Sequence, residues 1–320
     1  MQIYAPGTRI GQYEIASNPM IGGMGVVYFC LDHNNNDRPV ALKTFKPEYL
    51  PDRAARDRFL REGTAWIDLV RHPNIVRCYG VEYTDPNAFL SLELIAKEQG
   101  REDASLRSWM GAPMPVEQAL LFALQIARGM KHATEKIPGF VHRDLKPENV
   151  LVGADKLPGT GINRLRVTDF GLVAILKDET GRLKDEENSD AIGRTHLTHG
   201  IVGTPLYMAS EQWQGEALGI YTDVYALGCI LYEMLTGQRA ADGKTIKELL
   251  TAHCAGKLRP IPVECPFEVR ELLTKSLALM PTQRLQSWDE FTCALEQAYI
   301  AQGVGSAPQI WVLAEESMGE

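Results

Sequence analysis

The sequence has no long apolar run, no leader-like N-terminus, no closely paired cysteines and no excess of positive charge. Its best apolar stretch, at 224–235, contains Glu233 and falls short of the roughly 18 residues that a membrane-spanning helix needs. The first residues, MQIYAPGTRIGQYEI, lack the basic region and apolar core of a secretory signal. We therefore expect neither a membrane span nor an export signal in this chain.

The charge balance excludes a further class of protein. The chain carries 33 Lys and Arg against 41 Asp and Glu, a formal net charge of −8, and its pI is about 5.5. Such a chain is not expected to coat nucleic acid or an anionic membrane. Its six cysteines are far apart and form no Cys-x-x-Cys pair, which favours reduced thiols in a cytoplasmic protein over a disulfide framework or a zinc site.

What the sequence does contain is the composition of an ordinary globular protein, with 320 residues, 45% of them hydrophobic and 23% charged. Its length suits about two domains of roughly 150 residues or one large domain. Residues 8–45 carry short β-branched and aromatic runs at 13–15, 26–29 and 40–42, separated by glycine and asparagine clusters, which predict strands. Further runs at 75–81 and 89–95 also predict strands.

Apolar residues at helical spacing dominate the rest of the chain. They predict one helix at 52–69, a long amphipathic helix at 116–136, and others at 222–235, 245–255, 267–279 and 288–301. The polar stretches 96–105 and 177–190 predict loops. We therefore expect a strand-rich part before about residue 95, a helix-rich part after it, and a tail or linker at 301–320.

Two motifs in the strand-rich part suggest phosphate binding, although each has a simpler interpretation. Residues 21–27 place Gly22, Gly23 and Gly25 between two predicted strands, where backbone N–H groups can approach a phosphate; a hairpin without a ligand is the alternative. Lys43 ends the strand at 40–42 and would contact a phosphate if a carboxylate such as Glu62 oriented it. Both are also ordinary solvent-exposed charges.

Two motifs after the long helix are more specific. Residues 142–149, His-Arg-Asp-Leu-Lys-Pro-Glu-Asn, put a carboxylate, an amine and a carboxamide in one loop. Asp169-Phe170-Gly171 then follows the strand-like run at 165–167. A structural turn is the alternative for either motif alone, but the two strings in this order are specific.

These residues resemble the protein kinases of the eukaryotic-like type, from about residue 10 to about residue 300. Residues 203–211 resemble the end of an activation segment, 223–228 a buried helix that begins with Asp, and Arg284 the partner of the Glu now at 211. The glycine string is typical of bacterial serine/threonine kinases. The resemblance implies an α+β, bilobal fold over 1–300, with a β-rich N-lobe (about 8–95) holding one regulatory helix and a mainly helical C-lobe (about 96–300).

The resemblance also implies ATP and Mg²⁺ as cofactors and gives roles to single residues. Phosphoryl transfer requires positioning and charge neutralisation more than covalent chemistry. By the family pattern, Asp144 accepts the hydrogen bond of the substrate hydroxyl and Lys146 stabilises the γ-phosphate. Asn149 and Asp169 hold Mg²⁺.

The nucleotide would be bound by residues of both lobes. Lys43, paired with Glu62, contacts the α- and β-phosphates, and the glycine loop covers them. The adenine lies between Val27 and Ala41 on one side and Leu151 on the other, with Leu92 as gatekeeper. The backbones of Glu93 and Ile95 recognise the edge of the adenine.

Lys146 and Thr204 follow the serine/threonine pattern, so the implied partner is a protein with a Ser or Thr acceptor. Arg143 before Asp144 is typical of kinases whose activation loop is ordered by phosphate, which pairs with Arg. Thr198 is the first candidate for autophosphorylation and Thr195 the second, with an unmodified surface hydroxyl as the alternative for each. A dimer of two copies would serve that reaction.

Three positions depart from the family pattern. Met20 stands in place of the first glycine, and its Cβ is expected to raise the KM for the nucleotide. Ser210 replaces a proline, with little expected effect. Trp66 lies four residues after Glu62, on the same helix face, where the family has a smaller apolar residue; its indole would either hold the helix in place or push it out.

Two other functions compete with an active serine/threonine kinase. A pseudokinase, acting as a nucleotide-binding or scaffold module, is favoured by Met20 and Trp66 and disfavoured by the complete set of catalytic residues. A small-molecule kinase is disfavoured by the segment at 203–211, which in the family docks peptide substrates.

Overall fold

The computed structural model describes residues 3–22, 25–45, 63–64, 66–67, 69, 71–84, 87–157, 160–170 and 206–303. The chain divides into two compact units, each described here by itself. The first contains Met1–Val70, Val76–Leu94 and a stretch that starts at Phe170; the second contains Arg71–Ile75, Ile95–Asp169 and Pro205–Glu320. Residues 71–75 therefore belong to the second unit, although the sequence on both sides of them belongs to the first.

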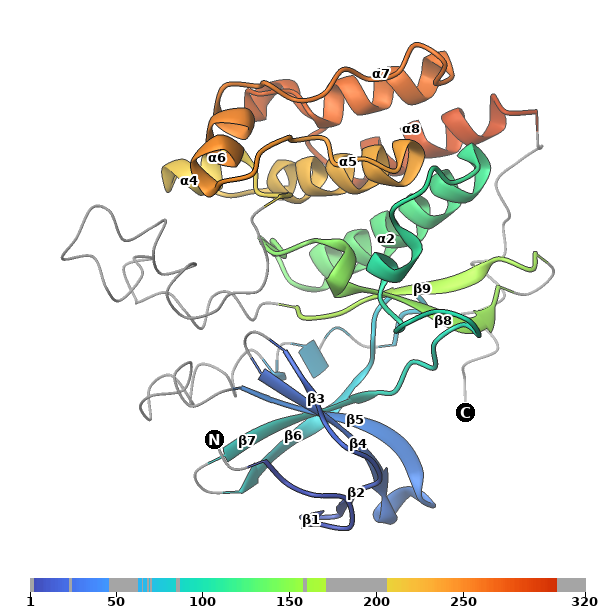
Figure 1. Ribbon diagram of the computed structural model, residues 1–320, viewed down its shortest axis with the longest axis vertical. Coiled ribbons are helices and arrows are strands. Elements are labelled where there is room, and N and C mark those ends of the chain that lie inside the picture. The colour runs from blue at the N-terminus through green and yellow to red at the C-terminus, as the bar shows by residue number, and fades with distance from the viewer. Residues whose placement is uncertain are drawn as a thin grey trace. The chain divides into compact units, whose positions relative to one another are not determined.

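The first unit is built on one antiparallel sheet of seven strands (Figure 1). Six strands follow the order β1-β2-β4-β5-β7-β6, and β3 pairs with β4. The short 3₁₀ turn η1 (His33–Asn35) connects β4 to β5. The strands are β1 (Arg9–Ile10), β2 (Tyr13–Ile15), β3 (Met20–Ile21), β4 (Gly25–Asp32), β5 (Arg38–Phe45), β6 (Cys78–Thr84) and β7 (Asn87–Glu93).

The two faces of this sheet differ because side chains alternate along each strand. Val26, Tyr28 and Cys30 of β4 are buried and pack with Val40 and Leu42 of β5 in one core. The residues between them, such as Val27 and Lys43, point to the opposite face and are only half-buried. Val27, Ala41, Lys43 and Leu92 lie on this second face.

The predicted strands at 13–15, 26–29, 40–42 and 89–95 are confirmed, with small changes at their ends. The strand predicted at 75–81 is wrong at its start, because β6 begins at Cys78. Ile75 instead forms a parallel bridge with Val167 in the second unit, beside a hydrogen bond from the Val167 N–H to the Asn74 carbonyl of 2.9 Å. Of the helix predicted at 52–69, only its last part is described, and Gly63, Thr64, Trp66 and Ile67 are helical.

The second unit is mainly helical, with one two-stranded hairpin (Figure 1). Helices α2, α5 and α8 pack against one another, and α2 also covers β9. The elements are η3 (Leu106–Trp109), α2 (Val116–Lys136), η4 (Pro147–Asn149), β8 (Val150–Lys156), β9 (Asn163–Val167), α4 (Ser210–Gln214), α5 (Ile220–Thr236), α6 (Ile246–Cys254), α7 (Phe267–Ser276), η6 (Pro281–Gln283) and α8 (Trp288–Ile300).

All five predicted helices of this unit are confirmed, and α2 has the predicted bounds. Helix α5 is buried on every side from Thr222 to Leu235, as expected for a helix at the centre of a helical unit. Helix α7 ends at Ser276, three residues before the predicted end, and the chain then leads to Pro281 at the start of η6.

The described helices include none that is both long and apolar enough to cross a membrane. All six cysteines are free thiols, and Cys30, Cys78 and Cys229 are buried.

Candidate active site

A carboxylate, an amine and an amide of the 142–149 loop meet in the second unit. The Lys146 Nζ donates to Asp144 Oδ2 at 2.7 Å. The Asn149 Nδ2 donates both to the carbonyl of Asp144, at 2.8 Å, and to its Oδ2, at 2.9 Å. The short turn η4 makes this possible, because Pro147 starts it and its bond from the Asn149 N–H to the Lys146 carbonyl brings the amide back towards Asp144.

The charge state of Lys146 is fixed by its neighbours. Burial lowers the pKa of Lys146, but the Asp144 carboxylate raises it by charge and hydrogen bonding, and Asp169 and Glu148 add to this, so that the net pKa is raised. The side chain is therefore an ammonium ion near neutral pH, and Asp144 is held by a cation and an amide at once.

The backbone of this loop is held by a buried carboxylate. The N–H groups of His142 and Arg143 donate to the two carboxylate oxygens of Asp223 at 2.7 and 2.9 Å. Asp223 is 1% exposed, and burial raises its pKa. Arg143 has a left-handed backbone (φ 67°), a strained conformation for a residue with a Cβ, which these two bonds and one from Gln212 to its carbonyl stabilise.

Asn149 and Asp169 lie at the two open ends of the β8–β9 hairpin. Val150 pairs with Val167, and the Thr168 N–H donates to the Asn149 carbonyl at 2.9 Å, so the residue before Asp169 is tied to Asn149. Because the Asn149 Nδ2 is committed to Asp144, its Oδ1 is the atom left for a cation. A carboxylate and an amide oxygen are the hard ligands that Mg²⁺ prefers, so these residues fit the implied metal.

The first unit brings its predicted nucleotide residues to one face of the sheet. Val27 lies opposite Lys43, and Ala41 lies opposite Leu92. Residues directly opposite in neighbouring strands share a face, so these four side chains form one surface, with the Lys43 ammonium beside apolar side chains. Met20 pairs with Val27 and adds to the same surface.

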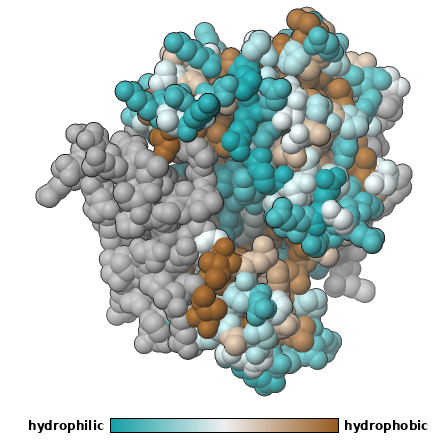
Figure 2. Space-filling view, viewed as in Figure 1, coloured by the Kyte–Doolittle hydropathy of each residue, from teal (hydrophilic) through white to brown (hydrophobic). Residues whose placement is uncertain are grey.

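The glycine turn has one position that is glycine for steric reasons. The Gly22 N–H donates to the Gly25 carbonyl at 2.8 Å and closes the turn. A Cβ on Gly25 would lie 2.2 Å from the Thr44 carbonyl oxygen, whereas one on Gly22 would meet nothing closer than 3.6 Å. Met20 and Ile21 of β3 are 51% and 59% exposed, and this strand forms an apolar area on the face drawn in Figure 2. Gly23 lies outside the described residues.

Three predicted adenine contacts, Glu93, Ile95 and Leu151, lie in or next to strands β7 and β8. The Glu93 N–H, at the end of β7, donates to the Arg77 carbonyl at 2.8 Å. Ile95, half-buried, follows as the first residue of the second unit. Leu151 is half-buried in β8 opposite Arg166 and forms a bridge with Ser105.

Trp66 is held firmly, which answers the question left open by the sequence. It is 2% exposed, its indole N–H donates to the Val76 carbonyl at 2.9 Å, and its ring lies 5.6 Å from that of Phe170. The indole therefore ties its helix to Val76 and packs against Phe170. Glu62, Thr195, Thr198 and Thr204 lie outside the described residues.

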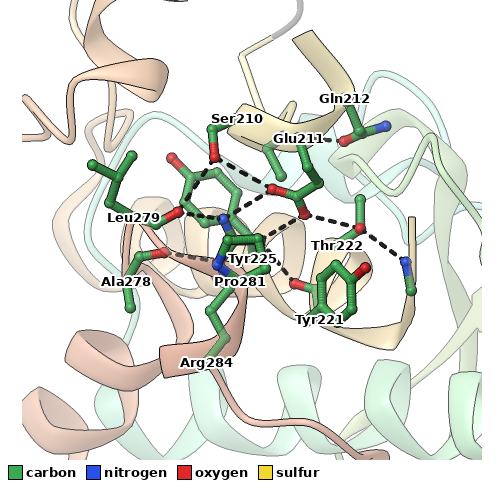
Figure 3. A network of polar contacts seen from close by, with 12 residues as sticks. Ser210, Glu211, Gln212, Tyr221, Thr222, Tyr225, Ala278, Leu279, Pro281 and Arg284 are labelled. Atoms are coloured by element: carbon green, nitrogen blue, oxygen red, sulfur yellow. Dashed lines mark hydrogen bonds and ion pairs between the residues drawn. The ribbon is translucent and has the colours of Figure 1, made fainter. Parts of the chain in front are cut away.

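The predicted pairing of Glu211 with Arg284 is a buried, bidentate ion pair in the second unit (Figure 3). Arg284 Nη1 and Nη2 donate to the two carboxylate oxygens at 2.7 and 3.0 Å. Thr222 donates to the same carboxylate at 2.9 Å, and the guanidinium lies over the Tyr225 ring. The pair ties α4, α5 and the segment after α7 together.

Sequence reasoning missed one cluster next to the catalytic loop. Arg107 donates to Glu148 and to Glu233, both at 2.8 Å, and also to the Tyr207 hydroxyl. Burial and the charge of Glu233 raise the pKa of Tyr207, so its hydroxyl stays protonated and donates to Glu233. Arg107 lies in the short turn η3 and belongs to no motif of the sequence, so only the spatial arrangement identifies it.

Comparison with known proteins agrees with this geometry. The family model described as protein kinase domain matches residues 20–300. The serine/threonine-protein kinase Pkn1 of Myxococcus xanthus is 29% identical over 298 residues, which cover 91% of this chain and 39% of that protein. PrkC of Bacillus subtilis is 29% identical over 304 residues (92% and 42%), and PknB of Mycobacterium leprae is 27% identical over 317 residues (96% and 46%).

The chain thus spans about two fifths to one half of the length of these relatives. The match over 20–300 contains the residues of the candidate site, from the glycine turn to Arg284. It confirms the resemblance to eukaryotic-like kinases of the bacterial type and the α+β kinase fold. From its sequence, its catalytic loop and this match, the chain belongs to the protein kinase domain family.

Proposed function

We propose that this chain is a serine/threonine protein kinase domain that transfers the γ-phosphate of ATP to hydroxyl groups of a protein. The observation that carries the proposal is the Asp144 carboxylate, held by the Lys146 ammonium at 2.7 Å and by the Asn149 amide at 2.9 Å. A carboxylate in this fixed position can accept the hydrogen bond of an acceptor hydroxyl and aim its oxygen at the phosphorus.

Each residue of the loop has a separate task in this reaction. Asp144 takes up the proton of the acceptor hydroxyl as that oxygen bonds to the γ-phosphorus, while the bond from this phosphorus to the bridging oxygen breaks and ADP leaves. Lys146, whose raised pKa keeps it charged, turns its ammonium to the γ-phosphate and lowers the cost of the negative charge there. Asn149 holds Asp144 through its Nδ2, which fixes the direction of the carboxylate.

The metal would be held by Asn149 and Asp169. Mg²⁺, when bound with ATP, neutralises charge on the phosphate oxygens. The protein's own contribution is to keep the two ligands at the open ends of the β8–β9 hairpin, where Thr168 ties them together. The left-handed backbone of Asp169 (φ 65°) is a second strained position supported by this arrangement.

The nucleotide would lie against the sheet face that carries Val27, Ala41, Lys43 and Leu92, and Leu151 would be a further adenine contact. Lys43 would contact the phosphates. Its predicted pairing with Glu62 is supported by Gly63, the next residue in the sequence. A Cβ on Gly63 would lie 2.7 Å from the side chain of Leu90, which is the cross-strand neighbour of Lys43. Gly22, Gly23 and Gly25 would cover the phosphates, and the backbones of Glu93 and Ile95 would read the adenine.

The substrate and regulation follow the family pattern. Lys146 supports a Ser or Thr acceptor on a protein. Arg143 supports activation by autophosphorylation, first at Thr198 and second at Thr195, with a second copy of the chain as the substrate. The free cysteines and the net charge of −8 favour a cytoplasmic domain that does not bind nucleic acid.

The test is phosphate transfer from Mg·ATP by the wild type, by Asp144→Asn and by a matched control, Asp242→Asn. Asp144→Asn should lose at least about 100-fold in rate, since it removes the proton acceptor. Asp242 is largely exposed and pairs with Arg259 away from the loop, so its variant should keep wild-type activity. Equal transfer by wild type and Asp144→Asn would refute the proposal. Binding of ATP without any transfer would identify a pseudokinase instead, and phosphate found only on tyrosine would overturn the specificity.

A further inference from the structure

The second unit contains a pocket of about 500 Å³ at the end of α5. Its volume is typical of a binding site. The pocket lies about three turns along α5 from Asp223, which holds the catalytic loop, so it is separate from the candidate active site. Its walls include Val116 of α2, Tyr232 and Leu235 of α5, and Pro260, Pro262 and Cys265 between α6 and α7.

The segment between α6 and α7, which forms one wall of the pocket, also exposes large apolar side chains. Val263 is 76% exposed, and Phe267, at the start of α7, is 65% exposed. They lie on either side of Cys265 in the sequence. Exposed apolar side chains grouped beside a pocket are typical of a surface that binds another segment of protein.

A buried donor in the same wall lacks an acceptor. Arg259 lines the pocket, and its Nη2 pairs with Asp242 at 2.7 Å. Its Nε is buried and has no hydrogen-bond partner among the residues that the structure describes. Since buried donors are nearly always paired, the pocket fits an occupant that brings a carbonyl or carboxylate oxygen as well as apolar side chains.

The chain itself contains a segment of this chemistry. Residues 310–314, Ile-Trp-Val-Leu-Ala, form a short apolar run between Gln309 and two acidic residues, Glu315 and Glu316. This run lies outside the described residues. Tryptophan is among the side chains that most often anchor a bound segment, because it covers a large apolar area and still carries a donor.

The course of α8 brings this segment within reach of the pocket. Asp289 at the start of α8 pairs with Lys131 of α2, and Glu296 nearer its end pairs with Arg128, which is closer to the start of α2. Helix α8 therefore leads towards the end of α2 where Val116 lines the pocket, about 18 Å along α2 from Arg128. From Gly303, where the described chain ends, eight residues to Trp311 can span up to about 26 Å.

We propose that residues 310–314 bind in the pocket at the end of α5, with Trp311 as the anchor among its apolar walls. A backbone carbonyl of the segment or the Glu315 carboxylate accepts the hydrogen bond of Arg259 Nε. Binding within one chain needs only a weak site, because a short linker holds the segment at an effective concentration on the order of 1 mM.

The test uses the reactivity of the Cys265 thiol in the full chain to measure how well the pocket is covered. Cys265 is half-buried in the pocket wall, whereas Cys293 is exposed on α8 and does not line the pocket. Alkylation by iodoacetamide, followed over time by mass spectrometry of the peptides, gives both rates in one sample. Cys293 is therefore an internal control.

Two variants should uncover the pocket from opposite sides. Trp311→Ala removes the anchor. Val116→Asp puts a charge into the pocket wall at the first position of α2, where an acidic residue favours the helix dipole, so the fold is kept. Val304→Ala, an apolar change in the same tail but outside 310–314, is the matched control.

Cys265 should react about tenfold faster in Trp311→Ala and Val116→Asp than in the wild type and Val304→Ala. A segment with a Kd of about 0.1 mM at an effective concentration of about 1 mM covers the pocket about ten to one. The rate at Cys293 should be equal in all four proteins. A synthetic peptide of residues 308–316, added to Trp311→Ala, should slow the reaction of Cys265 again, with half its effect at about 0.1 mM.

Equal rates at Cys265 in the wild type and Trp311→Ala would overturn the proposal. Faster alkylation of Cys293 as well would mean that the whole unit has loosened, and would also count against it. If the rate at Cys265 of the wild type rises on dilution, the segment comes from a second copy, and binding within one chain is wrong. These readouts involve no phosphate transfer, so their outcome is independent of the proposed kinase function.

Discussion

Removal of Arg284 should destabilise the second unit by about 3–5 kcal/mol, because it leaves the Glu211 carboxylate buried without its counter-charge. Arg284 and Glu211 side chains are 0% and 1% exposed. The guanidinium makes two bonds to the carboxylate and further bonds to the carbonyls of Ala278, Leu279 and Tyr221, at 2.8, 3.0 and 3.2 Å (Figure 3). In an Arg284→Leu variant, the donors left to the carboxylate among the described residues would be the hydroxyls of Thr222 and Ser210.

Urea unfolding followed by circular dichroism would measure the loss as a shift in midpoint at unchanged slope. Arg239→Leu, at an exposed position of the same unit, is the matched control and should change the free energy of unfolding by less than about 0.5 kcal/mol. The double variant Glu211→Gln with Arg284→Leu removes both charges and keeps the acceptor for Thr222. It should be about 1–2 kcal/mol more stable than Arg284→Leu alone.

Two results would refute this reasoning. A loss below about 1 kcal/mol for Arg284→Leu would mean that the carboxylate finds water or a proton at little cost. A double variant less stable than Arg284→Leu would mean that the charge of Glu211 is not what destabilises the single variant.

Two further predictions concern the glycine turn and a buried histidine. Gly25→Ala should lower the free energy of unfolding by about 1–3 kcal/mol, because its Cβ would meet the Thr44 carbonyl. Gly22→Ala should leave the melting temperature unchanged and affect only the KM for ATP, because its Cβ would meet nothing closer than 3.6 Å. Equal melting temperatures of the two variants would contradict this prediction. Burial lowers the pKa of His253 to about 4, so below its ordinary value of 6.5 the unfolded chain binds a proton that the folded chain does not, and stability falls as the pH drops through this window. Between pH 7 and pH 5 the wild type should lose about 2 kcal/mol more than His253→Gln in urea unfolding, and parallel pH profiles would count against it.

The sequence predicts those parts of the structure that depend on local pattern. Helix α2 has the predicted bounds because its apolar residues repeat at helical spacing over its whole length. Asp144, Lys146 and Asn149 could be assigned because they share one short loop, whose turn brings them together.

The parts that sequence reasoning missed depend on contacts between distant segments. Ile75 and Val76 read as strand residues, but Ile75 pairs with Val167 and Val76 accepts the bond of Trp66. The local pattern at 75–81 is the same for residues that make these distant contacts as for residues that belong to a strand. The same holds for Arg107, whose partner Glu233 lies on α5, far along the chain.

The short segment at 71–75 has a consequence for dissecting the molecule. The Asn74 Nδ2 donates to Gln125 and to the Leu165 carbonyl, at 3.1 and 2.9 Å, and its carbonyl accepts from Val167. A Cβ on Gly129 of α2 would lie 2.6 Å from that carbonyl, so the helix is shaped around this segment. A fragment that starts at residue 95 would therefore lack the segment 71–75. The Val167 N–H, two residues before Asp169, and the Leu165 carbonyl would lose their hydrogen bonds to Asn74. Residue 95 is thus no place to separate the units, since the second unit also depends on residues 71–75, which precede that boundary.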